Sequence, residues 1–271
     1  MKKLTSHLVP ATLVGLLSLP FAATQVFAQT TPPAAPATAP AAAPEPTPEN
    51  TLVPKVSLYT EYEYRGISQT AEKPAGQFNL DYTHTSGFYL GTFVSNVKWL
   101  KEAAKASGFS TSANIEWDLF GGYKFDIAKD VTLDLGYLRY EYPSSKAFNP
   151  SPNTDEIYIG VSSGAFSAKY SHSTSNLFGF SNSKNSSFTE INWSQEILPK
   201  LTANAQIARQ TVKHNGDYSY TVYKLGATYD LGDGWAAGGY GKNTNAKEAF
   251  YTVNGKDLSK ARLVAFVSKS F

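Results

Sequence analysis

The one segment of the chain whose side chains suit nucleophilic catalysis runs from Tyr170 to Asn176, with the sequence Tyr-Ser-His-Ser-Thr-Ser-Asn. His172 stands there among hydroxyl groups and an amide, the groups that serve as base, nucleophile and orienting group in serine hydrolases. A lipid hydrolase with His-x-Ser spacing needs a serine two positions after the histidine, where this chain has Thr174. We therefore predict no catalytic site, and a lipid hydrolase is a weaker alternative for this chain than the non-enzymatic functions.

Metal and phosphate chemistry have less support still. The chain has no cysteine, and His84 and His214 are isolated in the sequence, without the spacing of a metal site. The glycine-rich stretches 232–234 and 238–241 are followed by neither a lysine motif nor a helix start, so a hairpin turn and a strand of small residues explain them. We expect no metal and no cofactor.

Charged residues recur instead at alternate positions within apolar stretches, where they would line the inside of a pore. Eight acids and two bases form this candidate set: Glu61, Glu63, Asp81, Glu116, Asp118, Asp134, Glu156, Lys169, Glu190 and Lys224. An excess of acids in a narrow lumen would favour cations over anions. The alternative is that these charges cancel in ion pairs and only plug or stiffen the structure.

The elements that would position these side chains are β-strands, because apolar and polar residues alternate with period two. In the first strand, predicted from Lys55 to Arg65, Val56 and Leu58 share one face with two tyrosines, while Glu61 and Glu63 lie on the other. Similar patterns predict strands around residues 78–82, 113–119, 131–137, 156–161, 166–171, 189–194, 201–207, 221–229 and 261–271. Residues 88–95 and 235–242 also read as strands, but which of their faces is apolar is uncertain.

The connections between these strands alternate in length. Short links lie near residues 85–87, 126–130, 163–164, 198–200 and 232–234, and long ones span about 65–75, 96–110, 143–154, 173–186, 212–218 and 243–260. Six long and five short links join 12 strands, as in bacterial outer-membrane barrels with both termini in the periplasm. The pattern predicts an all-β, antiparallel, up-and-down transmembrane barrel.

Composition agrees with export to a membrane. Removing Lys2 and Lys3 leaves 22 basic against 22 acidic residues, a neutral mature chain with no basic cluster for nucleic acid. The chain has 17 tyrosines and 16 phenylalanines, yet after its first 28 residues no segment approaches the ~20 apolar residues of a membrane helix. If the chain spans a membrane, it spans it as a barrel.

The first 28 residues read as a cleaved secretory signal peptide, with Lys2 and Lys3, an apolar stretch 13–19 and the cleavage tripeptide 26–28. Residues 29–54 are dominated by Ala, Pro and Thr, a composition that favours an extended, disordered linker. A tether toward the cell wall is the alternative for this linker. The barrel domain is expected over residues 55–271.

The last strand ends in Phe271, which shares an apolar face with Leu263, Ala265 and Val267. A terminal aromatic on an apolar face resembles the signal that the barrel assembly machinery recognises. Lys269 lies on the same face, where a lysine near the membrane interface can extend its ammonium group to water.

Two further features lie in the long links. Arg65 is a candidate structural clamp, since it ends the first predicted strand within reach of Glu61, Glu63 or a lipopolysaccharide phosphate. The segment 99–107 (Trp-Leu-Lys-Glu-Ala-Ala-Lys-Ala-Ser) has helical propensity, and we expect an exposed loop helix, with an inward constriction as the alternative.

Residues 56–97 resemble the opening of the TorF porin family, a group of exported proteobacterial proteins. The resemblance is carried by Tyr64-Arg65-Gly66-Ile67-Ser68-Gln69, then Pro74, Gly87-Phe88-Tyr89-Leu90-Gly91 and Ser95-Asn96. It would cover about residues 54–271, with the later part matched by strand pattern more than by motif. The resemblance implies an outer-membrane barrel that acts as a pore.

We therefore expect a passive outer-membrane porin for small polar solutes or ions, with no chemical step. Its partners would be outer-membrane lipids and lipopolysaccharide, the barrel assembly machinery and the solutes themselves, with no nucleic acid. A closed barrel with an adhesive or structural role in the envelope is the main alternative.

Overall fold

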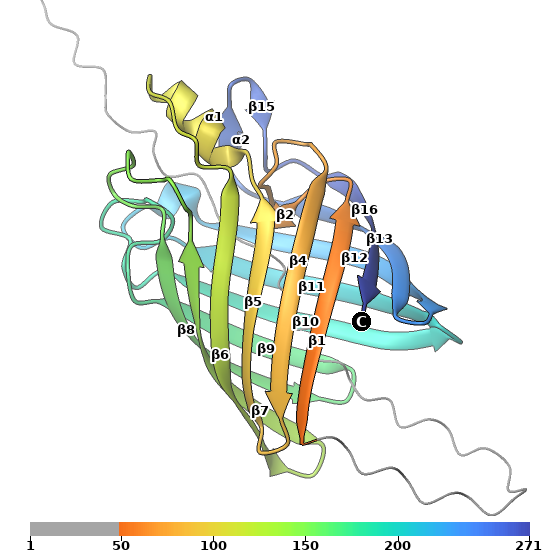
Figure 1. Cartoon of the computed structure of the whole chain (residues 1–271). Helices are drawn as coiled ribbons and strands as arrows, with labels where there is room; N and C mark the ends of the chain where they lie inside the picture. The colour runs from red at the N-terminus through yellow and green to blue at the C-terminus, as the bar shows by residue number, and fades with distance from the viewer. Residues whose placement is uncertain (1–48) are drawn as a thin grey trace, which may run out of the picture.

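The alternating stretches form a closed barrel of 12 antiparallel strands in the computed structural model, which describes residues 49–271 (Figure 1). Each strand pairs with its neighbours in the sequence, and β1 closes the barrel against β16. The prediction of a 12-stranded antiparallel up-and-down barrel is confirmed. The strands are β1 (Asn50–Tyr59), β4 (Ala75–His84), β5 (Phe88–Asn96), β6 (Ile115–Ala128), β7 (Val131–Glu141), β8 (Thr154–Ser163), β9 (Phe166–Ser173), β10 (Ser187–Leu198), β11 (Leu201–Thr211), β12 (Tyr220–Gly232), β13 (Trp235–Thr244) and β16 (Arg262–Ser270).

The first strand differs from its prediction at both ends. It begins at Asn50, so residues 50–54, expected in the linker, belong to the barrel wall, and it ends at Tyr59 instead of continuing to Arg65. The predicted signal peptide and residues 29–48 of the predicted linker lie outside the described residues. The first and the last strand begin and end, respectively, at the end of the barrel that carries the short links. An even number of antiparallel strands returns the chain to the side from which it started.

The outer face of the barrel is apolar. Leu225 and Leu263 are 67% and 87% exposed, and most strands present further leucine, isoleucine or aromatic side chains outward. Near the short links the exposed side chains include the aromatic residues Phe88, Tyr123, Phe166, Tyr229 and Trp235. So large an apolar surface is unfavourable in water and suits the hydrocarbon of a bilayer, with aromatic rings at the interface.

Glycines of the inner face make room for neighbouring aromatic rings. A Cβ atom added at Gly136 would lie 2.3 Å from the Tyr158 hydroxyl, and one at Gly122 would lie 2.5 Å from that of Tyr89. The rings therefore lie across the wall over the glycines of the adjacent strands. These contacts also show which face of the two uncertain strands points inward. Tyr89 faces inward on β5, and Tyr240 faces inward on β13.

The long loops gather at one end of the barrel (Figure 1). A hydrophobic core there combines side chains of these loops with inward-facing strand residues such as Phe93 of β5 and Tyr140 of β7. It includes the buried face of α1 (Trp99–Ala106) and aromatic side chains of the other long loops, among them Phe178 and Tyr251. The remaining loop elements are η1 (Gly216–Tyr218), α2 (Glu248–Tyr251), β14 (Thr252–Val253) and β15 (Lys256–Asp257). None of the helices formed by residues 49–271 combines the length and the hydropathy needed to cross a membrane.

Candidate functional site: a charged segment inside the barrel

The segment between β1 and β4, residues 60–74, turns into the barrel instead of extending its wall. Its two short strands β2 (Glu63–Tyr64) and β3 (Ile67–Ser68) form a hairpin, and all four of their residues are buried. The turn between them has positive φ at two successive positions, Arg65 (45°) and Gly66 (85°), which glycine adopts without strain at the second. We call residues 60–74 the inserted segment.

Arg65 joins the inserted segment to the far wall. Its guanidinium donates to both carboxylate oxygens of Glu156 on β8, at 3.0 and 2.8 Å, and to Oε1 of Gln210 on β11 at 3.0 Å. The guanidinium also lies 4.2 Å from the ring centroid of Phe188. Arg65 and Glu156 are 4% and 1% exposed, so this is a buried, bidentate ion pair.

The partners expected for Arg65 were wrong. Glu61 and Glu63 pair with other cations, because the chain turns inward after Tyr59 and directs Arg65 across the lumen. Burial disfavours the charged guanidinium, but the combined effect of Glu156, Tyr64 and Tyr140 still raises the pKa of Arg65 above its ordinary value. Arg65 therefore stays charged.

The inserted segment also contacts the last three strands of the barrel, β12, β13 and β16. Glu63 pairs with Lys224 of β12 at 2.8 Å, and Lys242 of β13 donates to the carbonyl oxygen of Gly66 at 2.8 Å. Glu61 lies 3.7 Å from the guanidinium of Arg262 on β16. Burial raises the pKa of Glu61, opposed in part by its hydrogen bond with Ser68 and by the two cations Arg262 and Lys242.

A third set of contacts reaches β6. The Tyr62 hydroxyl of the inserted segment donates to Glu116 at 2.5 Å, and Tyr142, just after β7, donates to the other carboxylate oxygen at 2.7 Å. Asp118 lies two positions further along the same inward face, and both Glu116 and Asp118 are 0% exposed. The inserted segment is therefore attached to β6, β8, β11, β12, β13 and β16, and it fills the lumen below the loop core.

Nearer the short links the inward side chains are more exposed. Asp81, Asp134 and Lys169 are all half-buried. Asp134 accepts a hydrogen bond from Tyr89 at 2.6 Å, and Lys169 pairs with Glu190 at 3.1 Å. The lumen is thus densely filled at the long-loop end and more open at the short-link end.

All ten predicted lining residues face the inside of the barrel, but by two routes. Glu61 and Glu63 enter it on the inserted segment, whereas the other eight project from the walls: Asp81, Glu116, Asp118, Asp134, Glu156, Lys169, Glu190 and Lys224. Arg65 also lies inside. Within the described part of the chain, no three His, Cys, Asp or Glu residues form a group suited to a metal ion.

Several inward-facing residues were not predicted from the sequence. Lys242 lies on the glycine-rich strand of uncertain facing, Arg262 begins the last strand, and Tyr62 was placed on the lipid face. The inward parity of Lys242 and Arg262 was a usable signal, since Lys242 follows Gly241 and Arg262 precedes the outward-facing Leu263. Together with Arg65 these cations reduce the excess of acids, and the ion pairing favours the alternative in which lumenal charges cancel.

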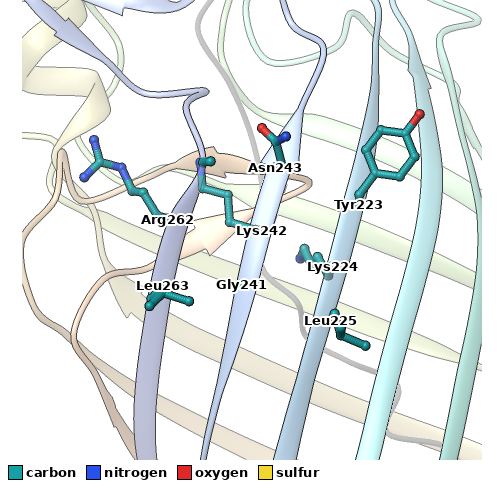
Figure 2. A pocket seen from close by; sticks show the side chains of 9 residues that line it. Tyr223, Lys224, Leu225, Gly241, Lys242, Asn243, Arg262 and Leu263 are labelled. Atoms are coloured by element: carbon teal, nitrogen blue, oxygen red, sulfur yellow. The ribbon is translucent and has the colours of Figure 1, made fainter.

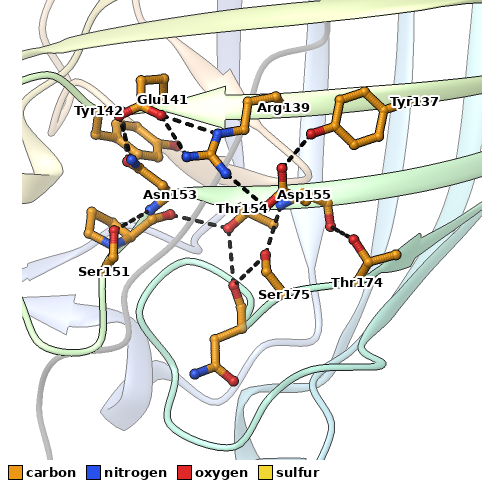
Figure 3. A network of polar contacts seen from close by, with 12 residues as sticks. Tyr137, Arg139, Glu141, Tyr142, Ser151, Asn153, Thr154, Asp155, Thr174 and Ser175 are labelled. Atoms are coloured by element: carbon orange, nitrogen blue, oxygen red, sulfur yellow. Dashed lines mark hydrogen bonds and ion pairs between the residues drawn. The ribbon is translucent and has the colours of Figure 1, made fainter.

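The outer surface near the long loops carries a separate polar network (Figure 3). Arg139 pairs with Glu141 and Asp155, both at 2.8 Å, and the Tyr137 hydroxyl donates to Asp155. His172 also faces outward, on the neighbouring strand β9. Its ring nitrogens contact Asn185 at 3.1 Å and the Tyr170 hydroxyl at 3.4 Å.

A pocket of about 590 Å³ lies in the barrel wall (Figure 2). Gly241 of β13 pairs with Leu225 and Leu263, and the missing side chain leaves a notch between these two exposed leucines. The pocket therefore belongs to the wall rather than to an open passage along the axis.

Comparisons with known proteins agree with this architecture. The model of a family described as "Bacterial protein of unknown function (Gcw_chp)" matches residues 43–271. No curated protein matches the chain. Among solved structures, the chain is similar to the KdgM porin, with 8% identity, a TM-score of 0.51 and coverage of 82% of this chain and 98% of that one. It is also similar to the NanC porin, with 12% identity, a TM-score of 0.50 and coverage of 82% and 99%. At these identities the similarity establishes the shared barrel fold alone.

Proposed function

We propose that this chain, which belongs to the bacterial family of unknown function Gcw_chp, is a porin-type channel of the outer membrane for small polar solutes or ions. The observation that carries the proposal is the division of side chains across a closed barrel wall, apolar outside and charged inside. The fold shared with the KdgM and NanC porins and the resemblance of residues 64–69 to the TorF family support it. Passage would be passive, without a cofactor or a chemical step.

In this proposal the two ends of the barrel face different compartments. The short links and both ends of the barrel domain face the periplasm, and the long loops face outward, as is usual for bacterial barrels. The signal peptide would direct export, and the last strand would be recognised by the barrel assembly machinery. Membrane lipids and lipopolysaccharide would surround the apolar wall.

The inserted segment would control passage in such a channel. It fills the lumen at the long-loop end and is attached to six strands, so solutes pass only where it leaves a gap or when it shifts. We assign Arg65 the role of clamp, since it connects the inserted segment to both β8 and β11. Glu116 and Asp118 are then the acids whose charge is least offset by cations.

A non-conducting structural or adhesive barrel is the second candidate. The observation that favours it is the burial of the inward side chains at the long-loop end, where Glu116, Asp118 and Glu156 are at most 1% exposed. A lumen filled by ion pairs in this way would stiffen the barrel without conducting.

Conductance of the folded mature protein in planar bilayers distinguishes the two. We expect stable steps with a reversal potential that favours cations, and a weaker cation preference after Glu116→Gln with Asp118→Asn. The control variant is Asp155→Asn, because Asp155 lies on the outer face of the wall. A folded barrel that conducts in neither the wild-type nor the Arg65→Ala form would contradict the channel and favour the structural role.

A further inference from the structure

Asp118 is the inward side chain that the interactions described above leave unexplained. It is 0% exposed, and neither carboxylate oxygen has a hydrogen-bond partner within residues 49–271. A buried carboxylate without a partner is costly, so proteins pair such groups, neutralise them with a proton or bind a cation to them.

The surroundings of Asp118 are acidic. The charged side chains that act on it are Glu116 and Glu156, and Glu156 is already paired with Arg65. Glu116 is two positions away on the same inward face of β6, and within the described part of the chain its hydrogen-bond donors are the phenols of Tyr62 and Tyr142. Two buried carboxylates therefore share one region, and no side-chain cation of residues 49–271 is paired with either of them.

We propose that Glu116 and Asp118 together bind one hard divalent cation of the Ca²⁺ type. Their two formal negative charges match a divalent ion, and both carboxylates and the neighbouring phenols offer oxygen, the ligand atom that such ions prefer. The unpartnered oxygens of Asp118 supply the free ligand atoms, and Glu116 keeps lone pairs beyond those that accept from the tyrosines.

The bound ion has a structural consequence. Tyr62 belongs to the inserted segment and Tyr142 to the loop after β7, so an ion at Glu116 fixes both against β6. The ion would thus hold the inserted segment to β6, in addition to the contacts that Arg65 makes with β8 and β11. This role is independent of whether the barrel conducts.

Terbium luminescence tests the site, because Tb³⁺ replaces Ca²⁺ and emits when a nearby tyrosine is excited. The mature barrel is folded in detergent with Tb³⁺, since the site is buried once the loops have closed. We expect tyrosine-sensitised emission that Ca²⁺ suppresses by competition. Asp118→Asn and Glu116→Gln each remove one ligand charge and should weaken binding about tenfold or more.

Asp134→Asn is the matched control, because Asp134 is also an inward acid with a tyrosine partner, Tyr89. Its emission should equal that of the wild type. Emission that is absent in the wild type, or unchanged in Asp118→Asn, would overturn the proposal.

Thermal unfolding of the wild type gives a second readout that needs no variant. Ca²⁺ present during folding should raise the unfolding temperature relative to folding in EDTA. Equal temperatures in the two conditions would overturn the proposal even where a variant fails to fold.

Discussion

Replacing Arg65 with alanine tests whether one ion pair holds the lumen closed. The change leaves Glu156 as a buried carboxylate whose remaining side-chain donor is Tyr140, at 3.2 Å. Breaking a buried pair from one side costs about 3–5 kcal/mol. If the inserted segment exchanges between a seated and a displaced position, a cost of about 3 kcal/mol raises the displaced fraction roughly 100-fold.

Single-channel recording measures this fraction directly. We expect Arg65→Ala to open more often or more widely than the wild type, and Arg65→Ala with Glu156→Gln to recover much of the closed behaviour, since no unpaired charge remains. Arg209→Ala is the matched control, because Arg209 lies on the outward face of β11 and contacts Thr221. Equal conductance in the wild type and Arg65→Ala, both folded, would refute the idea that this pair seats the segment.

Two further predictions concern the wall and are measured by urea unfolding in liposomes. Gly136→Ala should destabilise the barrel by about 1–3 kcal/mol because its Cβ would overlap the Tyr158 ring, whereas Gly160→Ala, whose Cβ meets no atom closer than 3.5 Å, should cost much less. Equal losses would contradict the packing of rings over glycines. Ile159→Arg, in the middle of β8, should cost about 2–4 kcal/mol and Ile197→Arg, near a short link, about 0–1 kcal/mol, if the outer face meets lipid. An equal cost at both positions would argue against a bilayer around this face.

The sequence predicted the barrel well because alternation is a local property. Each strand shows its own period of two, and turn residues mark the links, so strand number and inward parity follow without knowledge of distant contacts. Gly232-Asp233-Gly234 and the turn at Gly164 are examples, with positive φ where the chain reverses. Helical propensity is also local and predicted the helix at 99–106, but the expectation of an exposed helix was wrong, because Trp99, Leu100, Ala103 and Ala104 are buried.

The same reasoning failed where the local pattern and the tertiary structure disagree. Alternation continues through Tyr62 and Tyr64, so the first strand was predicted to extend to Arg65. In the structure this stretch leaves the wall after Tyr59, because its tyrosines and charges find partners across the lumen that lie 54 to 145 positions away in the sequence. No local signal reports such partners.

What the sequence by itself determined is the closed antiparallel barrel and the inward direction of the eight predicted charged residues on its strands, since both depend on side-chain period and link length. Only the tertiary structure decided how those charges are used. It pairs Arg65 with Glu156 and Glu63 with Lys224, and it leaves the Asp118 carboxylate without a hydrogen-bond partner among the described residues. The physical reason is that ion pairs depend on distances between strands that meet only when the barrel closes.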